Sequence, residues 1–149
     1  MFKSSNSLKV NTGIIKLIGF YSNREHEEGS QLDLCNRRII EHEYASLGES
    51  YHCNVEVIDS AEESIIDPGQ TLVSLEVSGG IDLAEFIHPE VPTTYLFGNY
   101  DNPRPSKVFT NVQHIVTISL PKVSWPLYGV GAATIVLHHR YHQYLENIK

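Results

Sequence analysis

Two stretches of this sequence place glycine, proline and polar residues directly after apolar runs. The first is the run 93–99, TTYLFGN, in which Gly98 is followed by Asn99. The second follows the apolar run 112–120 and begins at Leu120-Pro121. Glycine lets a ligand approach the backbone closely, and proline fixes a loop conformation. Together the two stretches predict a shallow pocket lined by main-chain amides and carbonyls.

Histidine is the other residue type that could do chemistry here, because three of the eight histidines lie close together near the end of the sequence. His138 and His142 have the four-residue spacing of a metal-binding pair on a helix, and His139 lies between them. No glutamate follows His138 in a His-Glu-x-x-His pattern, and no third ligand can be assigned. We therefore expect a stripe that faces solvent or a dimer partner, and no metal site.

Composition limits the class of protein. The 149 residues carry a formal net charge of −7, which argues against blanket binding to nucleic acid but leaves room for a local basic patch. No apolar run approaches the roughly 18 residues of a membrane span, and the first ten residues lack the apolar core of a secretion signal. Two cysteines, Cys35 and Cys53, are too few for a disulfide framework. We expect one cytoplasmic domain over residues 1–149, with residues 1–12 as a flexible segment, and no membrane partner.

The elements that must position these residues alternate between strands and helices. Apolar runs predict strands at 13–21, 53–59, 71–77, 93–99 and 112–120. Helical spacing predicts helices at 31–48, 60–66 and 131–148, with Gly48 as the stop of the first, and one or two helical turns at 81–88. This order predicts an α/β fold with a mostly parallel sheet flanked by helices. In such sheets a ligand lies beyond the carboxyl ends of the strands, where the glycine and proline stretches fall.

The run from Thr93 to Leu145 resembles the C-terminal half of the SPOUT superfamily, in its TrmH/SpoU-like branch of RNA methyltransferases. That family has a strand ending in Gly-x-Glu, a strand ending in Ile-Pro, and a Ser-x-Asn motif entering a helix of small residues. Gly98 matches the first glycine, and Leu120-Pro121 matches the Ile-Pro pair. Ser124, Leu127 and the run 131–133 (Gly-Ala-Ala) match the last motif.

The resemblance implies a C-terminal trefoil knot, S-adenosyl-L-methionine as cofactor, a homodimer, and a structured tRNA or rRNA as substrate for 2′-O ribose methylation. It implies that the cofactor is held mostly by main-chain groups. The cofactor-binding residues it implies are Leu96, Phe97, Gly98, Asn99, Leu120, Pro121, Leu127 and Tyr128. The small residues at the start of the last helix, Gly129 and Gly131 among them, are expected to let that helix pass close to neighbouring backbone.

The sequence departs from the family pattern at the active site. Tyr100 aligns with the motif glutamate, Pro126 aligns with the motif asparagine, and the loop between Pro121 and Ser124 is about four residues shorter than the family's. The family's catalytic arginine has two candidate counterparts. One is Arg24, in the loop after the first strand, and the other is the pair Arg37 and Arg38 on the first helix.

Arg24 and Ser124 are the expected catalytic residues, and each has a structural alternative. Arg24 either contacts the substrate phosphate or pairs with neighbouring glutamates in its loop. Ser124 either bonds the substrate or caps the last helix. Asn99 is either a pocket residue or a turn residue. Tyr100 and Trp125 either stack on a base or pack in the core or a dimer interface.

Two functions follow. The first is an S-adenosylmethionine-dependent RNA methyltransferase with a divergent active site. The second is a non-catalytic module of the same fold that binds RNA, protein or S-adenosylmethionine without methyl transfer. Loss of the motif glutamate and asparagine favours the second, because function depends on the site rather than on the fold. The family resemblance favours the first, which is the function we expect.

Overall fold

A computed structural model describes residues 15–21, 31–59, 69–76, 79–97, 112–121 and 129–148. The described residues form a six-stranded sheet in the order β2-β1-β5-β3-β6-β4. Its strands are β1 (Ile15–Tyr21), β2 (Asn54–Asp59), β3 (Thr71–Glu76), β4 (Ile81–Asp82), β5 (Thr93–Phe97) and β6 (His114–Thr117). Every described pair of neighbouring strands is parallel, which confirms the predicted α/β class with a parallel sheet.

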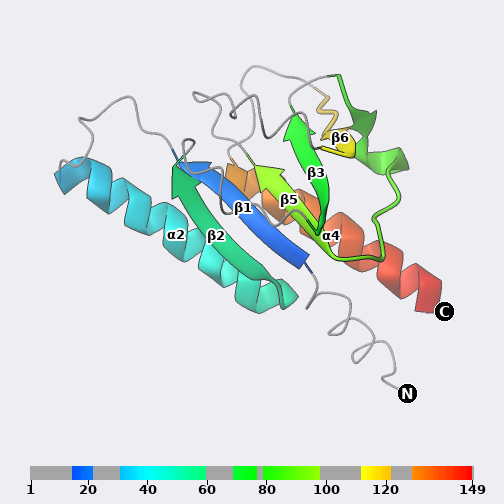
Figure 1. The fold of residues 1–149 in the computed structure, drawn as a ribbon, viewed down its shortest axis with the longest axis horizontal. Helices are drawn as coiled ribbons and strands as arrows, with labels where there is room; N and C mark the ends of the chain where they lie inside the picture. The colour runs from blue at the N-terminus through cyan, green and yellow to red at the C-terminus, as the bar shows by residue number, and fades with distance from the viewer. Residues whose placement is uncertain are drawn as a thin grey trace.

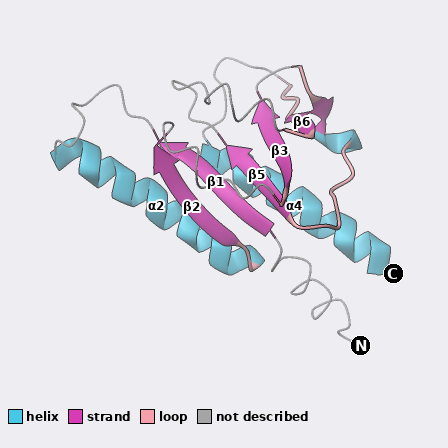
Figure 2. Ribbon diagram, in the orientation of Figure 1, coloured by secondary structure: helices cyan, strands magenta, loops and turns pink. Residues whose placement is uncertain are grey.

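Two long helices pack against this sheet, α2 (Gln31–Tyr51) and α4 (Gly129–Ile148). Figures 1 and 2 show both helices behind the strands, with α2 beside β2 and β1 and α4 crossing behind β5. They also contact each other. A single turn of 3₁₀ helix, η2 (Leu83–Glu85), follows β4.

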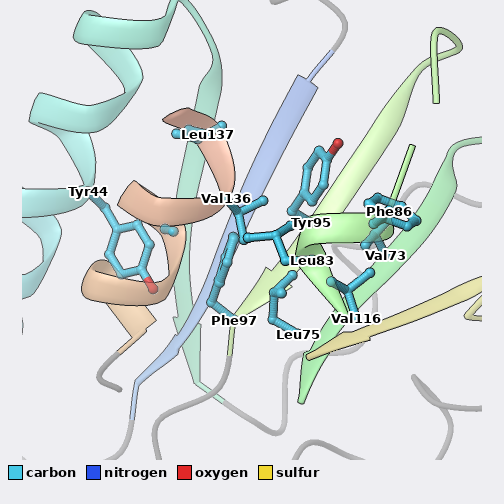
Figure 3. Close-up of a cluster of buried hydrophobic side chains, with 11 residues drawn as sticks. Tyr44, Val73, Leu75, Leu83, Phe86, Tyr95, Phe97, Val116, Val136 and Leu137 are labelled. Carbon is cyan, nitrogen blue, oxygen red and sulfur yellow. The ribbon is translucent and has the colours of Figure 1, made fainter. Parts of the chain in front are cut away.

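The core lies between the sheet and the two helices. Tyr95 and Phe97 of β5 and Val73 of β3 are buried against Val136 and Leu137 of α4 (Figure 3). All five residues of β5 are buried, so this central strand is covered on both faces. Such continuous burial is typical of parallel strands and explains why this run is almost wholly apolar or β-branched.

The first helix ends differently from the prediction. Helix α2 continues past Gly48 to Tyr51, and His52 takes the left-handed conformation, with φ 53°. The amide of Cys53 donates to the carbonyl of Gly48 at 3.0 Å, which closes the helix in the pattern of a Schellman motif. Gly48 is needed for a different reason, since a Cβ there would lie 2.8 Å from Cγ2 of Val55 and 2.9 Å from the carbonyl oxygen of Cys53.

Two other sequence predictions need correction. The expected helical turns at 81–88 begin instead as β4, which pairs with β6 through Ile81 and Val116, and only Leu83–Glu85 is helical. A Cβ added at Gly131 would meet no heavy atom of the described residues within 4 Å, so the described structure does not show the expected close approach there. Ala133 is the fully buried small residue of this segment. The expected helix at 60–66 and the segment 1–12 lie outside the described residues.

Candidate functional site

The carboxyl edge of the sheet brings two of the predicted stretches together. Leu75 of β3 is in register with Phe97 of β5 on one side and with Val116 of β6 on the other. Because all three strands run parallel, the ends that lead to Gly98 and to Leu120-Pro121 lie at the same edge, with β3 between them. The topology thus brings the two strand ends to one edge, and the pocket itself stays a prediction.

Leu96 and Phe97 can meet a ligand at this edge only through their main chains. Their side chains are 0% and 1% exposed, respectively, and Phe97 belongs to the core cluster against α4. Leu120 is half-buried and Pro121 is exposed at the end of the segment that follows β6. This arrangement fits a cofactor that is recognised by main-chain amides and carbonyls.

Three polar residues at the same edge were not predicted from the sequence. Glu76, the last residue of β3, lies between the two stretches, and its Oε1 accepts a hydrogen bond from the buried Ser74 hydroxyl at 3.0 Å. Thr117, the last residue of β6, accepts the Gly80 amide through Oγ1 at 3.0 Å. Only glycine fits at position 80, because a Cβ would lie 2.7 Å from the carbonyl oxygen of Ile115.

Asp82 is the third of these residues, and it anchors the segment that leads to Leu120-Pro121. A hydrogen bond from the Ser119 hydroxyl, and then one from the Ala84 amide, lower the pKa of the Asp82 carboxyl. The Ala84 amide donates to Oδ1 of Asp82 at 3.0 Å, so one carboxylate caps η2 and holds the chain after β6. Nothing in the sequence indicates that these residues share one edge, because they come from three strands that only the tertiary structure brings together.

Six of the predicted site residues fall outside the described residues. They are Arg24, Gly98, Asn99, Ser124, Leu127 and Tyr128. Tyr100 and Trp125, the candidate stacking residues, also lie there. Their roles stay predictions.

The alternative arginines on α2 have distinct surroundings. Nε of Arg37 forms an ion pair with Oε1 of Glu41 at 2.9 Å, and its Nη2 lies 3.4 Å from the carbonyl oxygen of Val57. These contacts tie the helix to β2. Arg38 is exposed. The geometry gives Arg37 a structural role, and Arg24 and Arg38 stay the candidates for the counterpart of the family's catalytic arginine.

A separate polar cluster lies under α4, away from the strand ends. His88 is 5% exposed, and its Nδ1 lies 2.8 Å from the Tyr95 hydroxyl. Its Nε2 lies 2.9 Å from Nδ1 of His139. Arg140, 2% exposed, donates from Nη2 to the Tyr144 hydroxyl at 2.5 Å and stacks over the Tyr144 ring, 4.1 Å from its centroid. These five residues are called the buried cluster below.

Arg140 sets one hydrogen-bond direction in the buried cluster. It donates to the Tyr95 hydroxyl, because a guanidinium can only donate. The Tyr95 oxygen has two lone pairs, so its contact with Nδ1 of His88 runs in either direction, according to the tautomer of His88. The same tautomer sets the direction of the contact between Nε2 of His88 and Nδ1 of His139.

The pKa values follow from this burial. Burial first, and then the His139 ring and the Arg140 guanidinium, lower the pKa of His88 to about 3. Burial raises the pKa of the Tyr95 hydroxyl, so Tyr95 stays protonated. Gln143 extends the contact, because Oε1 accepts the His88 amide at 3.0 Å and Nε2 donates to the carbonyl of Phe86 at 2.6 Å. The cluster holds α4 to β5 and to residues 86–88, and its low exposure gives it a structural role.

The histidine stripe of the sequence analysis therefore divides in two. His139 packs into the buried cluster, whereas His138 and His142 are exposed on α4. Within the described ranges, no group of three or more histidine, cysteine or acidic side chains is placed to hold a metal ion. Of the helices in the same ranges, none combines the length and apolar character needed to cross a bilayer.

Comparison with solved structures identifies the architecture. The methyltransferase AviRb from Streptomyces viridochromogenes, solved with AdoMet, superimposes with a TM-score of 0.55 at 17% identity over 94% of this chain. An RNA 2′-O ribose methyltransferase superimposes with a TM-score of 0.60 at 15% identity over 91% of this chain. The fold is that of the SpoU/TrmH RNA methyltransferases. The resemblance drawn from the run 93–145 is thereby confirmed at the level of the fold.

The SpoU/TrmH likeness extends beyond the motif region, because 98% of this chain also aligns with the A. aeolicus TrmH/SpoU tRNA modifying enzyme, at 12% identity and a TM-score of 0.55. The chain covers 84% of that enzyme, but only 53% of AviRb and 58% of the 2′-O ribose methyltransferase. It therefore spans little more than half the length of those two proteins. No protein-family model and no curated protein matches the sequence.

Proposed function

We propose that this protein is an S-adenosylmethionine-dependent methyltransferase that acts on the ribose 2′-oxygen of a structured tRNA or rRNA. The observation that carries the proposal is the carboxyl edge of the sheet, where the strand ends leading to Gly98 and to Leu120-Pro121 lie one strand apart. The likeness to SpoU/TrmH structures, one of them solved with AdoMet, supports the choice of cofactor.

The residues at this edge fit S-adenosylmethionine. Leu96 and Phe97 turn their side chains into the core and leave main-chain groups for the adenosyl part. Glu76 places a carboxylate at the same edge, which suits a ligand that carries a sulfonium and an ammonium group. The bound cofactor would supply an electrophilic methyl group, so that a C–O bond to the ribose forms as the C–S bond breaks and the hydroxyl proton passes to water.

The remaining assignments extend this proposal. Asn99, Leu127 and Tyr128 complete the cofactor site, Arg24 holds the phosphate beside the acceptor ribose, and Ser124 bonds the substrate. Positioning the acceptor oxygen in line with the methyl group supplies most of the catalysis, because the electrophile is already activated. The segment around Ser124 forms the trefoil knot, and two copies of the chain form the active dimer.

A non-catalytic module of the same fold is the second candidate. Tyr100 and Pro126 at the positions of the motif glutamate and asparagine favour it. Such a module would bind RNA, protein or S-adenosylmethionine and transfer no methyl group.

Calorimetry with S-adenosylmethionine separates the two candidates, followed by methyl transfer to bulk tRNA and rRNA with a labelled methyl group. We expect binding that Gly98→Val abolishes, because the added side chain fills the approach to the end of β5. Arg24→Ala should leave cofactor affinity unchanged and reduce methyl transfer, whereas Arg38→Ala tests the alternative candidate, the exposed arginine on α2, and should leave methyl transfer unchanged. Absence of binding at millimolar cofactor, together with a gel shift of structured RNA, would replace the enzyme with the binding module.

A further inference from the structure

The exposed face of α4 carries two imidazoles whose nitrogens point at each other. His138 and His142 are one helical turn apart, and their Nε2 atoms lie 3.0 Å from one another. The two ring planes are nearly perpendicular, at 87°, with their centroids 4.5 Å apart. Both side chains are exposed, so neither nitrogen is enclosed by the core. A small cation could reach both lone pairs from solvent.

Tyr51, the last residue of α2, orients the first of these rings. Its hydroxyl lies 3.2 Å from Nδ1 of His138. When this hydroxyl accepts the Nδ1 proton, Nε2 of His138 keeps its lone pair, 3.0 Å from Nε2 of His142. Metal-binding histidines are commonly held in this way, with the second ring nitrogen donating to a fixed oxygen.

The separation of the two nitrogens is compatible with chelation of one ion. With metal–nitrogen bonds of about 2.05 Å, a nitrogen–nitrogen distance of 3.0 Å corresponds to an angle at the metal of about 95°. Right-angle positions occur in square-planar and octahedral complexes, which Cu²⁺ and Ni²⁺ prefer over the tetrahedral geometry of Zn²⁺.

The remaining coordination positions would open toward solvent. The described residues supply no third metal ligand to this pair. His138 borders a groove of about 600 Å³ between the end of α2 and α4, which is also lined by Tyr51, Tyr141 and Thr134. Water, or a small ligand in the groove, would complete the coordination of the ion.

We propose that His138 and His142 form a two-histidine chelating site for Cu²⁺ or Ni²⁺ on the exposed face of α4, with Tyr51 as a positioning residue. This proposal departs from the expectation of no metal site. The sequence shows the spacing of the two histidines, but only the structure shows how their rings lie relative to each other. It is independent of the methyltransferase proposal, since the site lies on the outer face of α4 and not at the carboxyl edge of the sheet.

Calorimetry on untagged, metal-free protein tests the site, with CuCl₂ and NiCl₂ titrated at neutral pH and glycine as a competing chelator for Cu²⁺. We expect one ion per chain, and tighter binding of Ni²⁺ than of Zn²⁺. His142→Ala should weaken Cu²⁺ binding about 100-fold, because the second ligand then no longer acts intramolecularly. Tyr51→Phe should weaken it about 10-fold while keeping the stoichiometry, as expected of a group that only orients a ligand.

His42→Ala is the matched control, because His42 is an exposed histidine on the other helix. It should bind Cu²⁺ as the unchanged protein does. Electron paramagnetic resonance of the Cu²⁺ form should show splitting from two imidazole nitrogens, reduced to one in His142→Gln. Equal affinity in His142→Ala and the unchanged protein would overturn the proposal. So would tighter binding of Zn²⁺ than of Ni²⁺, or four coordinating nitrogens with one ion per two chains.

Discussion

On α4, the neighbouring residues His138 and His139 belong to two series of contacts with the same residue types. The first series, called the buried triad, consists of Tyr95, His88 and His139 of the buried cluster. The Tyr95 hydroxyl lies 2.8 Å from Nδ1 of His88, and Nε2 of His88 lies 2.9 Å from Nδ1 of His139.

The second series, called the exposed triad, consists of Tyr51, His138 and His142. The Tyr51 hydroxyl lies 3.2 Å from Nδ1 of His138, and Nε2 of His138 lies 3.0 Å from Nε2 of His142. Successive residues of a helix point about 100° apart, so one histidine enters the protein and the next faces water.

The difference between the two triads lies in what surrounds them. Arg140 donates to the Tyr95 hydroxyl in the buried triad, and burial keeps His88 neutral. In the exposed triad, water competes for each nitrogen, so the same contacts contribute little to stability and leave lone pairs available to a ligand. Identical residue types therefore act as structure on one face and as a candidate binding site on the other.

The largest expected effect comes from removing His88. In His88→Leu, the Tyr95 hydroxyl and the His139 ring lose their contacts to it inside the protein. Each buried polar group deprived of a partner costs about 1–3 kcal/mol. We expect the free energy of unfolding in urea to fall by about 2–5 kcal/mol. His138→Leu, the same change in the exposed triad, should alter it by less than about 0.5 kcal/mol. An equal fall in the free energy of unfolding in both variants would show that the buried triad stabilises the fold no more than the exposed one.

The two triads should also differ in their effect on the pH dependence of stability. The pKa of His88 is about 3 in the folded protein, against 6.5 for the free side chain. Between these values the unfolded chain binds a proton that the folded protein does not. Stability therefore falls as pH falls, by about 1.4 kcal/mol per pH unit. In urea titrations from pH 6.5 to 4.5, above the range where most carboxylates titrate, the free energy of unfolding should fall by about 2 kcal/mol, because the slope is only half developed at pH 6.5.

The control for this pH dependence is a pair of glutamine variants. His88→Gln should flatten the dependence between pH 6.5 and 4.5, whereas His138→Gln should keep it. If both variants retain the slope of the unchanged protein, His88 does not stay neutral in the folded state.

The two tyrosines give a finer comparison, because each donates or accepts one hydrogen bond at a histidine Nδ1. Tyr95→Phe keeps the buried ring and removes only the hydroxyl, so it should lower the free energy of unfolding by about 1–2 kcal/mol. Tyr51→Phe should change it by less than about 0.5 kcal/mol, since water replaces the hydroxyl. Thermal unfolding of the two variants at pH 7.5 measures the difference, and a larger loss in Tyr51→Phe would reverse the assignment of the two triads.

The smallest effect is expected for His142→Ala in metal-free buffer, where stability should change by less than about 0.5 kcal/mol. Added Ni²⁺ should raise the melting temperature of the unchanged protein, because the ion binds the folded state and joins two side chains of one helical turn. His142→Ala should show no such rise. A melting temperature that rises equally in both proteins would place the ion elsewhere.

Much of the fold was accessible from local patterns. The apolar runs that became β1, β2, β3 and β5, and the spacing that became α4, were predicted within a few residues of their observed bounds. The motifs around Gly98 and Leu120-Pro121 were sufficient to predict the SpoU/TrmH likeness that the solved structures confirm at the level of the fold. The end of α2 was misplaced because Gly48 has two possible uses, and only the approach of Val55 shows which applies.

By itself, the sequence determined the period of each element, and with it the α/β class, because apolar spacing fixes which faces are buried. It also determined which residue types stand where strands end. The tertiary structure alone decided the partners across the chain. Glu76 came to the edge between β5 and β6, His88 met His139 across 51 residues, and His138 and His142 turned their nitrogens together. Polar contacts of this kind depend on distance and direction between segments, and a one-dimensional pattern carries neither.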